Sequence, residues 1–158
     1  MRAYADTSFL VKLLTQEPGT ATAVADYRRL GRPAVFFLPL HGLEVANAIR
    51  QRAFRQRRRA SASERAAIQR ERDTSLALLH KFIARRAFIE IVSDMDAAME
   101  RARRLSERHT ERLGCRGFDL LHLALALELE CDAFLTSDRM QGALGRAEGL
   151  DVTVCPEG

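Results

Sequence analysis

Short apolar runs alternate with stretches of helical periodicity along the whole chain, and this order limits the folds that the chain can adopt. The apolar runs are rich in Val, Ile and Phe, as strands prefer, and we expect strands at residues 2–5, 34–38, 88–92, 133–136 and 152–155. Strands that alternate with helices indicate an α/β sandwich with a mostly parallel sheet. At 158 residues, the chain fits a single domain, residues 1–158, without repeats or low-complexity linkers.

Two capping-box patterns predict helix starts. Ser61 with Glu64 opens one long helix, and Ser93 with Asp96 opens another. In the second helix, apolar residues recur at helical spacing and predict one buried stripe. Its members are Met95, Ala98, Ala102, Leu105, His109 and Leu113.

The stretch 118–129 is apolar around nearly its whole circumference, which is typical of a central, buried helix. Asp119 lies at the start of this helix, where the helix dipole stabilises an anion. We also assign the pair Met95 and Met99 to core packing.

Cysteine usage and the N-terminal residues indicate a cytoplasmic protein. The three cysteines, Cys115, Cys131 and Cys155, are an odd number without CxxC or zinc-finger spacing, so the sequence predicts neither a disulfide framework nor a structural zinc site. Charged residues interrupt the first thirty residues, which excludes a signal-peptide pattern, and no apolar run reaches membrane-spanning length. We therefore expect a soluble, cytoplasmic protein with no membrane partner.

Positive charge is concentrated in one segment. The net charge is +4, but residues 50–72 hold nine arginines against Glu64 and Glu71, a surplus of seven, so the rest of the chain is net negative by three. A basic segment on an acidic body indicates a bound polyanion beside a cation site. The alternative is a solvated arginine-rich helix surface, because charge runs are usually solvated faces.

Four acidic residues stand at positions where parallel sheets bind ligands. Asp6 follows the first strand-like run, and Asp138 follows the run at 133–136. Glu44 lies in the first turn of one predicted helix, and Asp119 opens another. Because ligands bind beyond the carboxyl ends of parallel strands, we expect Asp6 and Asp138 to face one crevice.

Converging carboxylates favour a hard divalent cation. Mg²⁺ and Mn²⁺ prefer carboxylate and water oxygens, whereas carboxylates without a cation repel one another and raise each other's pKa. Such ions activate water and stabilise the leaving oxygen of a phosphodiester. No dinucleotide-binding, P-loop, nucleophile-elbow or zinc-protease motif competes with this interpretation. Each acid also has an ordinary alternative role as a helix cap, a dipole partner or a turn residue.

Four segments carry a resemblance to a known family. They read YADTSFLVKL from Tyr4, LEVANAIR from Leu43, GFDLLHLALA from Gly117 and LTSDR from Leu135. On these segments the chain resembles the PIN-domain ribonucleases, and among them the VapC-type toxins of type II toxin–antitoxin pairs, over nearly its full length. The resemblance implies a three-layer α/β/α sandwich with a central parallel sheet.

The same resemblance implies a site and partners. Asp6, Glu44, Asp119 and Asp138 would be both the catalytic residues and the ligands of Mg²⁺ or Mn²⁺ in a metal-dependent endoribonuclease. RNA would be the substrate, and the protein would form a homodimer. A cognate antitoxin would place its C-terminal segment in the active-site groove. We assign electrostatic guidance of RNA to six arginines: Arg50, Arg52, Arg55, Arg57, Arg58 and Arg59.

Polar residues near the acids have two interpretations each. Four hydroxyl residues either hydrogen-bond the carboxylates or merely start helices. They are Thr7, Ser8, Thr136 and Ser137. Asn47, one turn after Glu44, either touches a phosphate or caps backbone. His122 is more often a hydrogen-bonded core histidine than a ligand or general base.

Three other functions stay open. A housekeeping PIN nuclease of RNA processing would share the chemistry and lack an antitoxin. A catalytically silent RNA-binding or interaction module would keep the fold, although a self-repelling cluster of acids argues against it. An α/β phosphatase with Asp6 as its nucleophile would have a second acid two residues on, where this chain has Ser8.

Overall fold

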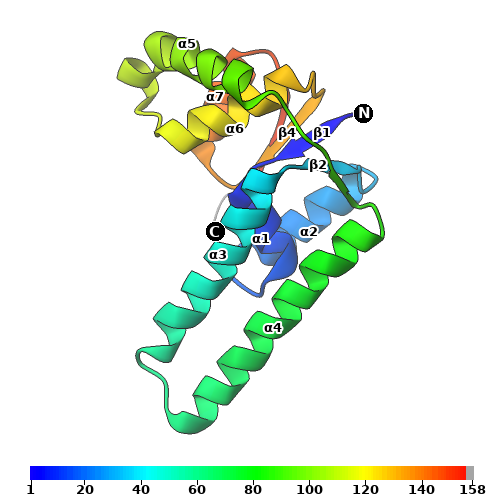
Figure 1. Ribbon diagram of the computed structural model, residues 1–158, viewed down its shortest axis with the longest axis vertical. Helices are drawn as coiled ribbons and strands as arrows, with labels where there is room; N and C mark the ends of the chain where they lie inside the picture. Colours follow the sequence, from blue (N-terminus) through cyan, green and yellow to red (C-terminus); the bar gives the residue numbers. More distant parts are fainter. Residues whose placement is uncertain (156–158) are drawn as a thin grey trace.

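A five-stranded, wholly parallel sheet forms the centre of the computed structural model, which describes residues 1–155 (Figure 1). Its strands are β1 (Ala3–Ala5), β2 (Val35–Phe37), β3 (Phe88–Glu90), β4 (Ala133–Thr136) and β5 (Asp151–Val154), in the spatial order β3-β2-β1-β4-β5. Every neighbouring pair is parallel, so the carboxyl ends of all five strands lie at one edge. The five predicted strands are confirmed, with ends shifted by at most two residues.

Helices cover both faces of the sheet (Figure 1). One face carries α1 (Thr7–Leu14), α2 (Thr20–Arg29), α3 (Pro39–Arg57) and α4 (Ala62–Ala84), and the other carries α5 (Met95–Leu113), α6 (Gly117–Glu128) and α7 (Arg139–Ala147). Side chains alternate between the two layers along each strand: in β1, Ala3 and Ala5 belong to the first core, and Tyr4 belongs to the second. The predicted three-layer α/β/α sandwich is therefore confirmed.

The central helix α6 is buried on nearly all sides, as predicted. Every residue from Asp119 to Ala126 is buried, because α5 packs along the outer side of α6. The stripe of α5 that makes this contact includes Ala98, Ala102 and Leu105. Asp119 is thus held where the buried part of α6 begins, whereas Phe118, which belongs to the stretch predicted to be buried, is 60% exposed.

Two sequence-based assignments in α5 are wrong. The N-cap is Asp94, not Ser93, because the Asp94 carboxylate accepts a hydrogen bond from the backbone N–H of Ala97 at 3.0 Å. Met95 and Met99 are 41% and 50% exposed, so neither belongs to the core. Met95, which was predicted to be part of the stripe, is the first residue of α5, and Met99 follows the buried Ala98 one position around the helix. Met99 instead lines the cavity described below.

α3 and α4 form a hairpin that extends away from the sheet (Figure 1). Its second helix starts at the predicted capping box, in which the Ser61 N–H donates to the Glu64 carboxylate at 2.7 Å. From this start, the first buried residue of α4 is Ser75. We call residues 50–72, which form the outer half of the hairpin, the arginine arm.

Two further predictions, on membrane-spanning helices and on cysteines, can be compared with residues 1–155. None of the helices within residues 1–155 combines the length and hydrophobicity needed to cross a membrane. Cys115, Cys131 and Cys155 are buried free thiols, in agreement with the absence of a predicted disulfide framework.

Candidate active site

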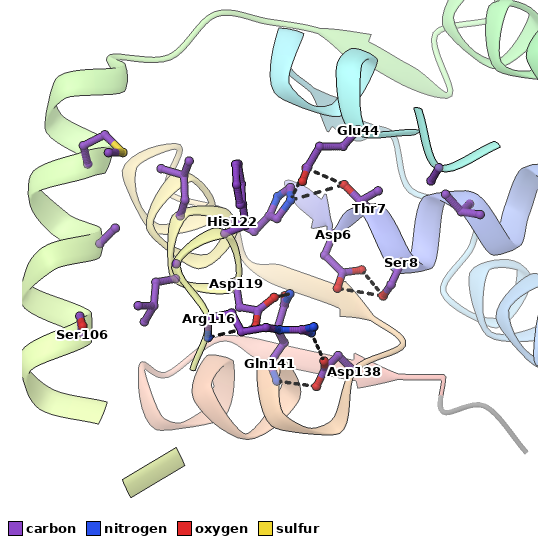
Figure 2. Close-up of a pocket in the computed structure, with 18 of the residues that line it drawn as sticks. Asp6, Thr7, Ser8, Glu44, Ser106, Arg116, Asp119, His122, Asp138 and Gln141 are labelled. Atoms are coloured by element: carbon purple, nitrogen blue, oxygen red, sulfur yellow. Dashed lines mark hydrogen bonds and ion pairs between the residues drawn. The ribbon is translucent and has the colours of Figure 1, made fainter. Parts of the chain in front are cut away.

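The four predicted acids line one cavity of about 810 Å³ at the carboxyl edge of the sheet (Figure 2). Asp6 directly follows β1, and Asp138 follows β4 by two residues. Asp119 comes from the first turn of α6. Glu44 comes from the second turn of α3, not from the first as predicted, because the helix already begins at Pro39. Four separate elements therefore bring carboxylates to one place.

Asp6 is enclosed by hydrogen-bond donors. It is 1% exposed and accepts bonds from the Thr136 hydroxyl at 2.7 Å, the Ser8 hydroxyl at 2.8 Å and the Phe9 N–H at 2.9 Å. Burial raises the pKa of Asp6, and these donors offset only part of that effect.

Glu44 is held by a relay of side chains, of which Figure 2 shows Thr7 and His122 beside it. His122 Nε2 lies 2.7 Å from a Glu44 carboxylate oxygen, and His122 Nδ1 lies 2.9 Å from the Tyr4 hydroxyl. Burial raises the pKa of Tyr4 well above its usual value, so this hydroxyl keeps its proton and can donate it to Nδ1. His122 thus links Tyr4 to Glu44 through its two ring nitrogens.

The relay also keeps Glu44 ionised. Burial alone would raise the pKa of Glu44, but hydrogen bonds from His122 and from the Thr7 hydroxyl, at 2.8 Å, bring it below its usual value. The prediction that His122 is a hydrogen-bonded core histidine is confirmed, since it is 3% exposed. Its partner is nevertheless one of the site acids. His41 stacks on His122 at 5.3 Å, and burial lowers the pKa of His41 to about 3, so a neutral ring backs the relay.

Asp119 and Asp138 share a cationic side chain that the sequence did not single out (Figure 2). Arg116 Nε donates to Asp119 at 3.0 Å, and Arg116 Nη2 donates to Asp138 at 3.3 Å. Gln141, from α7, donates to the other Asp119 oxygen at 2.8 Å. The i, i+3 spacing of Arg116 and Asp119 was a local signal for the first contact, whereas the bridge to Asp138 depends on the tertiary fold.

The supporting polar residues have different outcomes. Thr7, Ser8 and Thr136 hydrogen-bond site carboxylates, as one interpretation predicted. Ser137 does not, because its N–H donates to the Ser8 hydroxyl at 3.0 Å and its own hydroxyl is buried without a partner among the described residues. Asn47 is exposed and lies outside the cavity lining, so its role in phosphate contact stays a prediction.

Comparison with known proteins settles the family. Residues 3–147 match the PIN domain. The chain belongs to the PIN-domain family. The crystal structure of PAE2754 from Pyrobaculum aerophilum is similar to it, with a TM-score of 0.55 and 18% sequence identity over 96% of this chain and 89% of that chain. This likeness shows a shared fold and no more. Comparison with curated proteins found no match.

PIN domains are typically metal-dependent nucleases, and the cavity suits that chemistry. Among residues 1–155, no three carboxylate, imidazole or thiol side chains lie close enough together to form a ready-made metal cage. The donors are nonetheless hard oxygens, and Mg²⁺ needs only one or two protein carboxylates because it keeps several waters. Arg116 already places positive charge between Asp119 and Asp138, so these two acids are the first candidates to hold a cation. Asp6 and Glu44 line the same cavity.

Proposed function

We propose that this PIN-domain protein is a metal-dependent endoribonuclease and the toxin of a type II toxin–antitoxin pair. The observation that carries the nuclease proposal is the single cavity that collects Asp6, Glu44, Asp119 and Asp138 from four different elements. Their carboxylates present hard oxygen donors, which Mg²⁺ and Mn²⁺ prefer, to one cavity. A Mg²⁺ or Mn²⁺ ion bound there would supply a Lewis acid that activates water toward an RNA phosphodiester.

The residues of the chain prepare the site for that ion. The His122 relay and Thr7 keep Glu44 ionised and oriented. Arg116 and Gln141 orient the Asp119 carboxylate, which would be one of the groups that hold the ion. Each carboxylate therefore has at least one partner that fixes its direction before substrate arrives.

The apolar side of the cavity supports the toxin proposal. Leu121 lines it together with two exposed side chains, Met99 at 50% and Phe118 at 60% exposure. An antitoxin segment with apolar side chains and one basic residue would cover this wall and neutralise the acids at the same time. The homodimer is part of the same proposal.

RNA cleavage by the purified protein tests the nuclease proposal. We expect a structured RNA pool to be cut in Mg²⁺ or Mn²⁺ but not in EDTA, and cutting to fall by about 100-fold or more in Asp6→Asn and Asp119→Asn, the loss expected when a group that stabilises the transition state is removed. Asp96→Asn, which changes an exposed acid of α5, is the control and should retain activity. RNA binding without cutting by the unchanged protein, across varied substrates, would favour the silent binding module.

Expression in bacterial cells tests the toxin proposal. We expect the unchanged protein to arrest growth and Asp119→Asn to leave growth unaffected. Co-expression of a small gene adjacent to this one should restore growth, and light scattering should report the mass of a dimer. Cleavage in vitro without growth arrest, and without an adjacent inhibitory gene, would instead support a housekeeping nuclease.

A further inference from the structure

The arginine arm contains a depression of its own, separate in its lining from the acidic cavity. It measures about 470 Å³, and five arginines surround it: Arg50, Arg57, Arg58, Arg65 and Arg72. Phe54 also lines it and is 63% exposed. A large aromatic side chain so open to water inside a ring of guanidinium groups is not explained by packing of the hairpin.

Helix geometry explains why these side chains converge. Phe54 and Arg57 follow Arg50 at i+4 and i+7, which is one face of α3, and Arg58, at i+8, is the C-cap residue of that helix. Arg65 and Arg72 are seven residues apart and lie on one face of α4. The antiparallel hairpin sets the two faces side by side (Figure 1).

Most of this positive charge has no acidic partner in the part of the chain that the structure describes. Arg72 pairs with Asp73 at 2.7 Å. Within residues 1–155, none of Arg50, Arg57, Arg58 and Arg65 forms an ion pair, although Arg65 Nε donates to the Ala60 carbonyl at 3.1 Å. Arg52, by contrast, points away and is bound by Glu17 and Glu71. The arm therefore separates arginines that hold the structure together from arginines that are available to a ligand.

The ligand that fits is a flexible polyanion with flat, stackable groups. One guanidinium group can bind two phosphate oxygens at the same time. An exposed aromatic ring stacks on any of the nucleic-acid bases. An acidic polypeptide would satisfy the arginines but would leave the face of Phe54 unused. A duplex would satisfy the phosphates, but its bases are stacked on one another already.

We infer that the arginine arm is a binding site for single-stranded RNA, with Phe54 as its stacking platform. This inference deepens the proposed ribonuclease function, since it names where a substrate strand is held outside the cavity. Binding to the arm does not require cleavage. The two proposals can therefore fail independently.

Fluorescence anisotropy with a labelled oligouridine tests the inference. All variants are built on Asp119→Asn and measured in EDTA over a series of KCl concentrations, so that RNA stays intact. Affinity falls as salt rises, so the slope of log affinity against log salt is negative. We expect the triple variant Arg50→Gln/Arg57→Gln/Arg58→Gln to reduce the magnitude of this slope by about 2, because each phosphate contact to a single strand contributes about 0.7.

A matched control and two aromatic variants make the test specific. Arg28→Gln/Arg29→Gln/Arg32→Gln removes the same charge from exposed positions at the end of α2 and just beyond it, and should leave the slope nearly unchanged. Phe54→Ala and Phe54→Leu should each weaken binding by about 5- to 100-fold, the loss expected for one base–aromatic stack. Leucine keeps the apolar bulk and removes only the ring. Circular dichroism establishes that each variant is folded.

Three results would overturn the inference. Equal losses from the arm and α2 triple variants would mean that net charge alone attracts RNA. Unchanged affinity in both Phe54 variants would remove the stacking platform. A polyglutamate peptide of the same charge that binds as tightly as oligouridine would identify an acidic protein as the partner. Cleavage of RNA by the unchanged protein is measured separately and bears only on the nuclease proposal.

Discussion

The site acids differ in what surrounds them, and the difference sets their behaviour. Asp6 has three neutral donors and almost no solvent, whereas Asp119 has a guanidinium and a carboxamide. A neutral donor only orients a carboxylate, while a guanidinium also competes with any cation for it. We therefore expect replacement of Asp6 to change the stability of the fold, and replacement of the partner of Asp119 to change metal affinity.

Replacing Asp6 by asparagine should stabilise the metal-free protein at neutral pH. Burial raises the pKa of Asp6 in the folded state above its usual 3.8, so the folded state loses stability as the pH rises from the unfolded pKa to the folded pKa, and the full cost remains at neutral pH. An asparagine side chain never ionises and remains a good N-cap for α1. In EDTA, the melting temperature of Asp6→Asn should exceed that of the unchanged protein by a few degrees at neutral pH.

The pH dependence separates burial from other causes. The advantage of Asp6→Asn should shrink as the pH falls through the raised pKa, and it should vanish below the unfolded pKa, where aspartic acid is neutral in both states. Asp96→Asn, at an exposed position, should show no such trend. A gain that stayed constant down to acidic pH would argue against a desolvation cost at Asp6.

Replacing Arg116 by glutamine should strengthen metal binding. The Arg116 side chain is 75% exposed, yet it bridges Asp119 and Asp138, so an incoming cation must displace it. Exposed ion pairs are each worth up to about 1 kcal/mol, which predicts Mn²⁺ affinity about 3- to 10-fold higher in Arg116→Gln by calorimetry. Arg103→Gln, which lines the same cavity but pairs with Glu100, is the control. Weaker Mn²⁺ binding in Arg116→Gln would mean that Arg116 positions Asp119 rather than competing for it.

At the scale of elements, α7 is placed by two glycines. A Cβ atom added to Gly145 would lie 2.9 Å from Val152 Cγ2 of β5, and one added to Gly142 would meet the side chain of Val154. The helix can therefore lie against the edge strand only where these side chains are absent. Its first turn is capped by Asp138, and it also carries Gln141, so the spacing of α7 and β5 fixes two polar groups of the cavity.

Gly145→Ala should destabilise the fold by about 1–3 kcal/mol, the usual cost of overpacking. Gly117→Ala is a matched control, because a Cβ there meets no atom within 4 Å and alanine favours the helix. Urea denaturation of the two variants measures the difference. Equal midpoints for Gly145→Ala and the unchanged protein would show that Val152 moves aside without cost.

The elements that sequence reasoning found are those defined by local pattern. The all-round apolar stretch of α6 and the five strand-like runs depend on neighbours within the segment. His122 and Glu44, by contrast, are 78 residues apart, and neither segment contains a pattern that predicts contact with the other. The assignment of Met99 to the core was wrong for a related reason. Met99 directly follows the buried Ala98, and local spacing did not show that the surface of α5 turns toward solvent at this position.

For the whole molecule, the strand order makes the N-terminal strand the middle of the sheet. β1 lies between β2 and β4, and the Thr136 hydroxyl that contacts Asp6 comes 130 residues later. A chain that ends at Cys131 would lack β4 and β5 and leave the other side of β1 unpaired. We expect this truncation to lose cooperative thermal unfolding, as measured by circular dichroism. A sharp transition would mean that β1, β2 and β3 form a stable sheet on their own.

The late arrival of β4 also has a meaning for protein synthesis. A ribosome must translate through Asp138 before all four acids exist, and β4 must insert beside β1 before they share a cavity. A nascent chain still tethered at the stage of α5 carries Asp6 and Glu44 without their counterparts. All four acids of the cavity therefore come together only in nearly finished molecules, after β4 has been translated.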